Sequence, residues 1–100
     1  SERGYVKVLN NVNHIFHLIC HTNLITCLLF HDGYLYSSEA VEGNNLIIKF
    51  DPLTGEQIMT YPMFDGAEKL LIQNNKLIAS NYTINIFNIE TGKLEKIIKE

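Results

Sequence analysis

The sequence has no tryptophan, one arginine, two cysteines and two prolines among its 100 residues. With Arg3 as its single arginine and a formal net charge of −3, the chain lacks the clusters of Lys and Arg that bind nucleic-acid phosphates. Two cysteines, Cys20 and Cys27, are too few for a disulfide framework and favour a reducing compartment. We therefore expect a cytoplasmic protein that binds no nucleic acid.

The sequence also lacks a long hydrophobic run. The longest apolar stretch, from Ile15 to Phe30, is interrupted by His17, His21 and Asn23. It falls short of the roughly 20 consecutive apolar residues that a membrane-spanning helix needs. Hydrophobic residues nevertheless make up 46% of the chain, which is enough to build a packed core. The composition predicts a globular protein without a membrane partner.

The most informative feature that is present is an internal repeat. Ile47, Phe50, Asp51, Thr54 and Gly55 recur 37 positions later as Ile84, Phe87, Asn88, Thr91 and Gly92. Leu28, Leu29, Leu35 and Ser38 recur 42 positions later as Leu70, Leu71, Leu77 and Ser80. One repeat explains both offsets if its first copy carries about five extra residues, at Glu39–Gly43. A period near 40 residues is typical of stacked repeat architectures.

Alternation of apolar and polar residues predicts that the repeat is built from strands. The stretch Thr83–Phe87 alternates as a strand with one buried face does. Asp32-Gly33, Asn74-Asn75, Thr54-Gly55 and Thr91-Gly92 offer residues that tolerate positive φ in tight turns. We expect ten strands, at 5–10, 14–20, 25–31, 33–38, 45–51, 56–62, 68–73, 76–81, 83–88 and 93–100.

The order of these signals resembles that of WD-repeat β-propellers. The stretch His14–Phe30 is similar to the outer strand, turn and inner strand of a WD repeat, with Cys20-His21 at the usual Gly-His. Phe50-Asp51 and Phe87-Asn88 stand where the family has Trp-Asp, and each is followed by the family's Thr-Gly turn. Phenylalanine replaces tryptophan in both copies, so the buried hydrogen-bond relay of the usual blade is absent or partial.

The resemblance implies an all-β fold of antiparallel four-stranded blades, incomplete as an isolated chain. Residues 5–20 would form the outer strands of a first blade, 25–62 a second blade and 68–100 a third. Each blade buries its faces against its neighbours. We therefore expect the chain to belong with the remaining blades of a larger propeller or with a complementary chain.

The residue types that could perform chemistry do not form a complete site. The zinc-ligand types occur at His14, His17, Cys20, His21, Cys27 and His31, but along a strand this spacing divides them between two faces. Cys27 with His21 or His31 lacks the orienting acid and oxyanion hole of a cysteine hydrolase. The stretch Asn81-Tyr82-Thr83 matches a glycosylation sequon, which we interpret as incidental. The sequence predicts no catalytic residue, metal or cofactor.

The length difference between the two copies points to a binding surface. In a propeller the loop containing Glu39–Gly43 emerges on the same rim as the turn that carries His21-Thr22-Asn23. Loops held by a rigid scaffold are where binding residues concentrate. A tolerated insertion explains the extra residues equally well. We expect partner-binding residues on this rim, at His21, Thr22, Asn23, Glu39, Glu42, Phe64 and Asp65.

The resemblance implies a non-catalytic protein–protein interaction scaffold whose rim loops bind protein or peptide partners. An adaptor or a substrate receptor in a larger complex would have this character. The alternative is a set of blades from a quinoprotein-like or hydrolytic propeller enzyme. Quinoprotein-like propellers dock their blades with tryptophans, and this chain has none.

Overall fold

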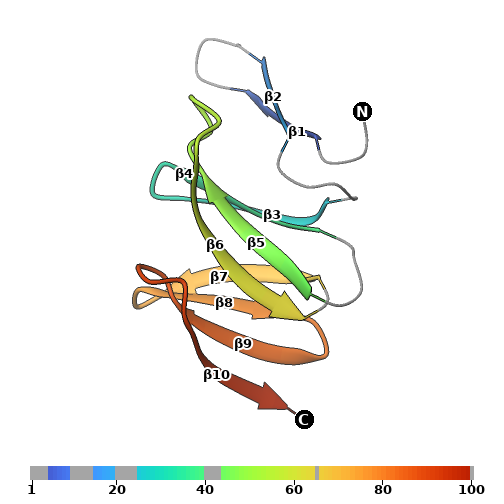
Figure 1. Cartoon of the computed structure of the whole chain (residues 1–100), viewed down its shortest axis with the longest axis vertical. Helices are drawn as coiled ribbons and strands as arrows, with labels where there is room; N and C mark the ends of the chain where they lie inside the picture. The colour runs from blue at the N-terminus through green and yellow to red at the C-terminus, as the bar shows by residue number, and fades with distance from the viewer. Residues whose placement is uncertain (1–4, 10–14, 20–24, 40–43, 65, 100) are drawn as a thin grey trace.

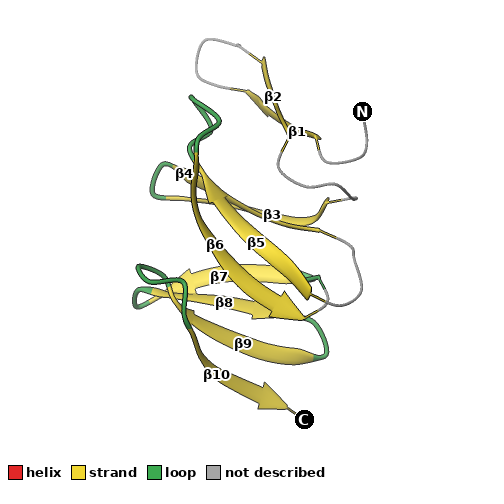
Figure 2. Ribbon diagram, viewed as in Figure 1, coloured by secondary structure: helices red, strands yellow, loops and turns green. Residues whose placement is uncertain are grey.

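The computed structural model describes residues 5–9, 15–19, 25–39, 44–64 and 66–99, with side chains at 27–38, 45–64 and 66–99. The described residues form β-strands joined by short loops (Figures 1 and 2). The strands are β1 (Tyr5–Leu9), β2 (Ile15–Ile19), β3 (Ile25–His31), β4 (Tyr34–Glu39), β5 (Asn44–Phe50), β6 (Gln57–Phe64), β7 (Lys69–Gln73), β8 (Lys76–Ser80), β9 (Thr83–Asn88) and β10 (Leu94–Lys99). All ten predicted strands are confirmed, with ends that differ by at most two residues.

The strands form three antiparallel sheets in which each strand pairs with the next along the chain. β1 and β2 make a two-stranded sheet, and the two four-stranded sheets have the orders β3-β4-β5-β6 and β10-β9-β8-β7. The expectation of an all-β fold with antiparallel four-stranded units is confirmed. No helix long and apolar enough to cross a membrane occurs among the residues that the structure describes.

The hairpin turns have the backbone conformation that their sequences predict. Asp32 and Gly33, between β3 and β4, have φ values of 52° and 84°. Asn74 and Asn75, between β7 and β8, have φ values of 52° and 60°. Two successive residues with positive φ let a two-residue turn follow the right-handed twist of its strands. The residue types thus fix the register of both hairpins.

The longer turns between β5 and β6 and between β9 and β10 share a set of equivalent hydrogen bonds. Asp51 Oδ1 accepts a hydrogen bond from the Leu53 N–H at 2.8 Å, and Asn88 Oδ1 accepts one from the Glu90 N–H at 2.9 Å. Two further bonds recur in the same way, from Gly55 N to Asp51 O as from Gly92 N to Asn88 O, and from Glu56 N to Thr54 Oγ1 as from Lys93 N to Thr91 Oγ1, while the bond from Thr91 N to Asn88 Oδ1 belongs to the second turn. The 37-residue repeat is therefore a repeat of turn structure.

The main core lies between the two four-stranded sheets. The first sheet contributes Tyr36, Ile47, Tyr61 and Met63, and the second contributes Leu70, Leu77, Ala79 and Phe87, with Ala67 from the connection between them. Across this core, β3 and β7 lie side by side. Each large side chain that is fully buried contributes about 1.5–3 kcal/mol to folding, so this interface dominates the stability of the pair.

The side chain of Ser38 also joins the two sheets. Its Oγ accepts a hydrogen bond from the backbone N–H of Ala67 at 2.8 Å, and both residues are buried. The structure therefore gives this buried serine a role between the sheets.

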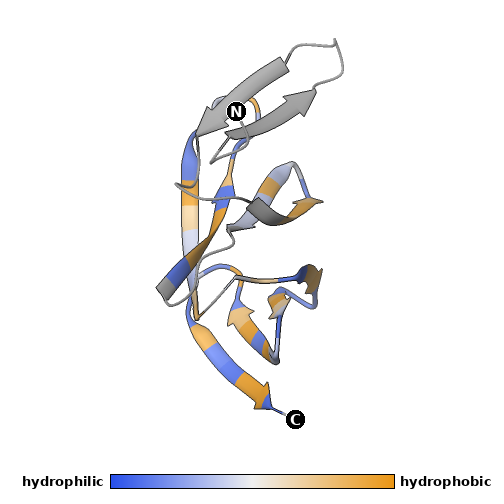
Figure 3. Ribbon diagram, turned by 90° about the vertical axis from the view of Figure 1, so that its right-hand side faces the viewer, coloured by the Kyte–Doolittle hydropathy of each residue, from blue (hydrophilic) through white to orange (hydrophobic). Residues whose placement is uncertain are grey.

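The opposite face of the second sheet is partly exposed and carries many apolar residues. We call it the open face; its apolar residues are Leu71, Ile78, Ile84, Ile86 and Ile98, and the strand register places Lys69, Ser80 and Lys96 on the same side. Leu71, Ile84 and Ile98 are 47%, 40% and 41% exposed. Hydrophobic and hydrophilic residues alternate in bands along β10 (Figure 3). A sheet with one face in the core would ordinarily carry polar residues on the other.

Candidate functional site

The structure describes part of the predicted binding rim. Of the seven residues predicted to bind a partner, Phe64 alone has a described side chain. Glu39 is the last residue of β4, where it pairs with Ile25 of β3. The others, His21, Thr22, Asn23, Glu42 and Asp65, lie outside the described residues. The site is therefore built from Phe64 and the residues around it.

Asn81 ties the turn between β8 and β9 to the connection between β6 and β7. Its Nδ2 donates hydrogen bonds to the carbonyl oxygens of Phe64 at 3.2 Å and Gly66 at 3.3 Å. Its Oδ1 accepts from the backbone N–H of Thr83 at 3.1 Å. An asparagine side chain supplies both donors and the acceptor that these contacts require. The sequon asparagine thus has a structural role, and an attached sugar would displace the two bonds made by Nδ2.

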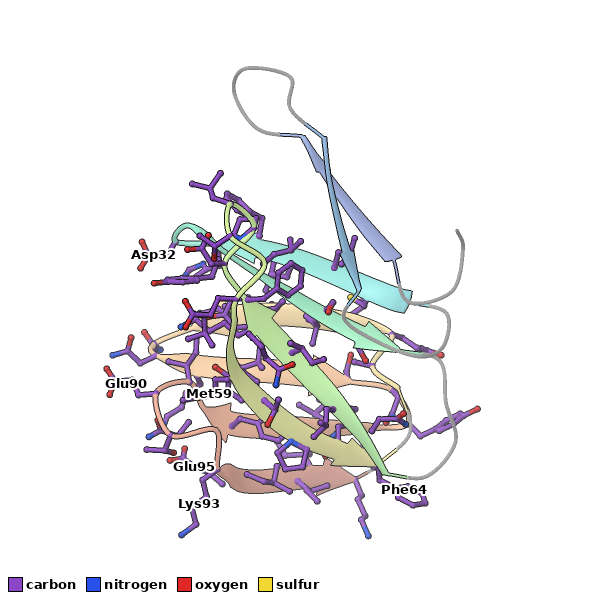
Figure 4. All side chains as sticks on the ribbon, turned by 45° about the horizontal axis from the view of Figure 1, so that its top comes forward. Asp32, Met59, Phe64, Glu90, Lys93 and Glu95 are labelled. Carbon is purple, nitrogen blue, oxygen red and sulfur yellow. The ribbon has the colours of Figure 1, made fainter. Side chains whose placement is uncertain are left out.

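A groove of about 340 Å³ lies beside this turn, between the ends of β6 and β10. We call it the β6–β10 groove. Besides Asn81, it is lined by Phe64, Tyr82, Thr83, Asn85, Ile97 and Lys99. Figure 4 shows Phe64 at the end of β6, far from Met59 and from the turn that holds Glu90. The groove and the repeated Asp51 and Asn88 turns therefore lie at opposite ends of the strands.

The strand register explains why four of these side chains meet. Thr83 pairs with Lys99 and Asn85 pairs with Ile97 between β9 and β10. Residues directly opposite each other in an antiparallel pair point to the same face of the sheet. This face is the one that carries Phe87 into the core, so the groove is a continuation of the interface between the two sheets.

Asn85 is a polar side chain in an almost fully buried position, with 6% of its surface exposed. Its Nδ2 donates to the carbonyl oxygen of Ala79 at 3.3 Å and to Thr83 Oγ1 at 3.0 Å. Because a carbonyl oxygen can only accept, the Ala79 contact fixes which end of the amide is nitrogen. The Asn85 Oδ1 accepts no hydrogen bond from the described part of the chain. It is therefore available to accept one from a molecule bound in the groove.

The repeat shows that the fold does not need a polar residue at this position. Asn85 lies 37 positions after Ile48, the same offset that relates Phe87 to Phe50. Ile48 is buried with 5% of its surface exposed, so an aliphatic side chain fills the same place in the first sheet. The Asn85 Nδ2 is paired within the second sheet, and its Oδ1 is not one of the buried atoms without a partner, so the oxygen opens on the groove. The packing of the sheet therefore does not explain why position 85 carries a polar side chain.

The walls of the β6–β10 groove expose aromatic surface. Tyr82 is 86% exposed and Phe64 is 69% exposed, while Ile97 is 45% exposed at the side of β10. Lys99 is exposed and adds a positive charge. Aromatic side chains are enriched at the centres of protein interfaces because they bury a large area with little loss of rotamer freedom. The groove thus combines apolar walls, the cation of Lys99 and the acceptor oxygen of Asn85.

Cys27 does not have the surroundings of a reactive thiol. It lies in β3 and packs against the core between the sheets. Burial raises the pKa of its thiol above the ordinary value, although hydrogen bonds from the backbone of Leu70 and Leu28 act in the opposite direction. A nucleophilic cysteine needs a lowered pKa, so the environment favours a packing role.

The residues of zinc-ligand type are described in part. His17 lies in the strand β2, so the helical spacing that would gather the ligands on one face does not apply to it. His14, Cys20 and His21 lie outside the described residues. Within the ranges that are described, no group of three or more His, Cys, Asp or Glu side chains is positioned to hold a metal ion.

Phe64 is the one residue of the groove that the sequence predicted to bind a partner, and this stays a prediction. Tyr82, Asn85, Ile97 and Lys99 come from two separate segments, and their proximity depends on the pairing of β9 with β10. One signal was available in the sequence, because the repeat aligns polar Asn85 with apolar Ile48. Such a mismatch at a buried position marks a residue that packing alone does not explain.

Comparisons with known proteins show the fold. No family model and no curated protein sequence matches this chain. Among solved structures, the chain is similar to the crystal structure of the computationally designed Ika8 protein, with a TM-score of 0.76 and 24% sequence identity. The match covers 94% of this chain and 30% of that one, so the chain spans less than a third of the designed protein's length. At this identity the likeness concerns the arrangement of strands and says nothing about activity.

Proposed function

We propose that this chain is part of a β-propeller and acts as a non-catalytic scaffold that binds protein or peptide partners on one rim. The observation that carries the binding function is the β6–β10 groove, with its exposed Tyr82 and Phe64 and the Oδ1 of Asn85, which accepts no hydrogen bond from the described residues. The groove lies where the β6–β7 connection meets the β8–β9 turn. Connections of this kind form the rim of a propeller, and rigidly held loops are common binding surfaces.

The open face supports the propeller arrangement. The repeat relates Leu71 to Leu29, Ile78 to Tyr36, Ile84 to Ile47 and Ile98 to Tyr61. In the first sheet these positions face the second sheet, and Ile47 and Tyr61 are fully buried there. The second sheet therefore presents to solvent the same positions that the first sheet uses for stacking. The occupant that fits is another four-stranded sheet of the same repeat.

The stacking can be tested with a second copy of the chain as the occupant. We expect sedimentation equilibrium to detect self-association of the whole chain at micromolar to millimolar concentrations. Lysine substitution of both Ile84 and Ile98 should abolish it, because two charges would lie in the interface. Leu53→Lys is the matched control, since Leu53 is 59% exposed in a turn away from the open face. A chain that stays monomeric throughout, or a double variant that associates unchanged, would count against this arrangement.

Partner binding can be tested by selecting peptides from a random display library on the immobilised chain. Selected peptides should be synthesised, and their affinities measured by calorimetry for the chain and for Tyr82→Ala. We expect micromolar binding that weakens at least about tenfold in the variant, as for an aromatic hot spot. Failure to select any reproducible binder, or binding that ignores Tyr82, would contradict a scaffold acting through this groove. An adaptor or substrate receptor of the cytoplasm is the cellular role we propose for such binding.

A further inference from the structure

The chemistry of the β6–β10 groove restricts what its occupant can be, and this inference rests on the scaffold function proposed above. Asn85 Oδ1 is an acceptor whose orientation is fixed by the two bonds of Nδ2, to Ala79 O and Thr83 Oγ1. A fixed acceptor in a mostly apolar surrounding discriminates strongly in favour of ligands that carry a donor. The occupant must therefore bring an N–H or O–H group into the groove.

The walls require that this donor belong to a largely apolar group. Phe64, Tyr82 and Ile97 provide the exposed hydrophobic surface around the acceptor. Aromatic rings pack well against other rings in offset or edge-to-face contacts. A volume of about 340 Å³ is of the size that holds one large side chain. Tryptophan and tyrosine join an aromatic body to a single donor at its edge.

The charge at the end of the groove adds a second element of recognition. Lys99 is exposed and pairs with Thr83 in the register of β9 and β10, next to the pair formed by Asn85 and Ile97. A carboxylate next to the aromatic residue of a ligand could form an ion pair with the Lys99 ammonium group. A phosphate is less well matched, because phosphopeptide sites rely on clustered arginines and the chain contains only Arg3.

We propose that the β6–β10 groove binds a tryptophan or tyrosine side chain of a partner peptide, with an acidic residue beside it in the peptide sequence. The indole N–H or phenol O–H donates to Asn85 Oδ1, the ring packs against Phe64 and Tyr82, and the neighbouring carboxylate pairs with Lys99. The groove would thus recognise a short peptide motif that contains an aromatic residue next to an acidic one.

The donor requirement can be tested without knowing the natural partner. N-acetyltryptophanamide, N-acetyltyrosinamide and N-acetylphenylalaninamide are titrated into the isotope-labelled whole chain, and shifts are followed at the Asn85 side-chain amide and the Ile97 methyl groups. We expect the first two probes to bind at least about fivefold more tightly than the third, which shares their amide groups and the phenyl ring of tyrosine but has no donor on its side chain. Equal affinity for the phenylalanine probe would overturn the proposal.

Substitutions of Asn85 test whether this residue recognises the donor of the probe. Asn85→Ile should erase the preference for the donor-bearing probes, and it should fold, because Ile48 fills the equivalent place in the first sheet. If it does not fold, Asn85→Leu provides the same removal of the acceptor with a different shape, and the comparison of probes on the unmodified chain stands by itself. Retention of the preference in a folded variant would overturn the role of Asn85.

The role of the Lys99 charge can be tested with a second pair of probes. The peptide acetyl-Trp-Glu-amide should bind more tightly than acetyl-Trp-Gln-amide, with a difference that disappears in Lys99→Gln and shrinks as salt is added. Lys96→Gln is the matched control, because Lys96 pairs with Ile86 and points to the open face. An equal effect of both lysine substitutions would overturn the role of Lys99.

The outcomes also separate this proposal from the scaffold function. Peptides selected on the chain that bind through Tyr82 but contain neither tryptophan nor tyrosine would refute the motif and leave the scaffold intact. Binding of the aromatic amides with no selectable peptide would instead argue against a peptide-binding scaffold and indicate a small-molecule site.

Discussion

The ring of Tyr61 on β6 meets the ring of Phe87 on β9 edge-on, with centroids 5.8 Å apart and ring planes at 70°. Both side chains are fully buried. The Tyr61 hydroxyl extends past Phe87 and donates a hydrogen bond to the carbonyl oxygen of Ile89 at 2.7 Å. One residue of the first sheet therefore makes both an apolar and a polar contact with the second, and this makes Tyr61 the best point at which to test the interface.

Shortening Tyr61 in two steps should separate these contacts. Tyr61→Phe removes the hydroxyl and leaves the Ile89 carbonyl without this donor, so we expect the free energy of unfolding to fall by about 1 kcal/mol. Tyr61→Ala also removes the ring and should cost about 3–5 kcal/mol through the cavity it leaves. Chemical denaturation followed by circular dichroism measures both. Similar losses for the two variants would show that the ring contact with Phe87 contributes little.

Alkaline pH should weaken the same interface. Burial, as the main cause, raises the pKa of Tyr61 and of Tyr36 above the ordinary value of 10.0. The folded protein therefore favours the neutral phenols. Their contribution is complete below pH 10 and is lost as the pH rises above that value, because the unfolded chain then releases protons that the folded chain retains.

Tyrosinate absorbance near 295 nm tests this expectation when it is recorded together with far-ultraviolet circular dichroism. We expect part of the tyrosine ionisation to coincide with alkaline unfolding. Tyr61→Phe should reduce the part that appears in the cooperative step. Ionisation of all tyrosines while the sheets stay folded would contradict the burial argument.

Gly92 and Gly33 form a matched pair for testing close backbone packing. Both have positive φ, 77° and 84°, so alanine is strained at either position by about 1–2 kcal/mol. A Cβ at Gly92 would also lie 2.8 Å from the carbonyl oxygen of Thr60, whereas one at Gly33 would meet nothing within 4 Å. We expect Gly92→Ala to lower the free energy of unfolding by about 1–3 kcal/mol more than Gly33→Ala does. Equal losses would mean that the turn after β9 moves freely away from β6.

The repeated turns predict which exchanges are tolerated. Asp51→Asn keeps the Oδ1 acceptor that Asn88 uses in the second copy, so we expect no measurable loss of stability. Asp51→Ala removes the acceptor and should cost about 1 kcal/mol. The reverse exchange, Asn88→Asp, should be worse than Asp51→Asn, since Asn88 Nδ2 donates to Glu95 Oε2 at 3.4 Å and a carboxylate there would repel Glu95. Thermal unfolding of the three variants checks this order.

The ion pair between Lys76 and Glu95 predicts a small acid sensitivity. The hydrogen bond from Lys76 is the main cause that lowers the pKa of Glu95 below its ordinary value of 4.5, and the two side chains are 38% and 36% exposed. The stabilising charged form is present above that value and is lost as the pH falls through the lowered pKa. Carbon-detected NMR titration of the Glu95 carboxyl should show the low midpoint, and Lys76→Met should raise it. Surface pairs are screened, so the shift should diminish at high salt.

The strands could be predicted from the sequence because their signals are local. Alternation along Thr83–Phe87 and the positive-φ residues at Asp32-Gly33 and Asn74-Asn75 act within a few residues of one another. The 37-residue offset added the equivalence of Asp51 and Asn88, and the hydrogen bonds at the two turns agree with it. Local chemistry thus determines both the strands and their order in each sheet.

The groove could not be predicted in the same way. Its walls join Phe64 with Ile97 and Lys99, residues brought together by the packing of two sheets and by the register of β9 with β10. A bulge between Leu94 and Lys96 shifts that register by an amount that the sequence does not reveal. Without the bulge, a one-residue slip would have turned Ile97 to the other face.

The distribution of side-chain size across the interface has a geometric consequence. Cys27 and Leu29 pack beside the first strands, where β3 and β7 adjoin, while the much larger Tyr61 and Phe87 separate the later strands. Two sheets spaced in this way form a wedge with its thin side at β3 and β7. If further sheets of the repeat stack on these two, as we propose, the row would curve toward the thin side, and the volumes of Tyr61 and Phe87 would set the angle of each step.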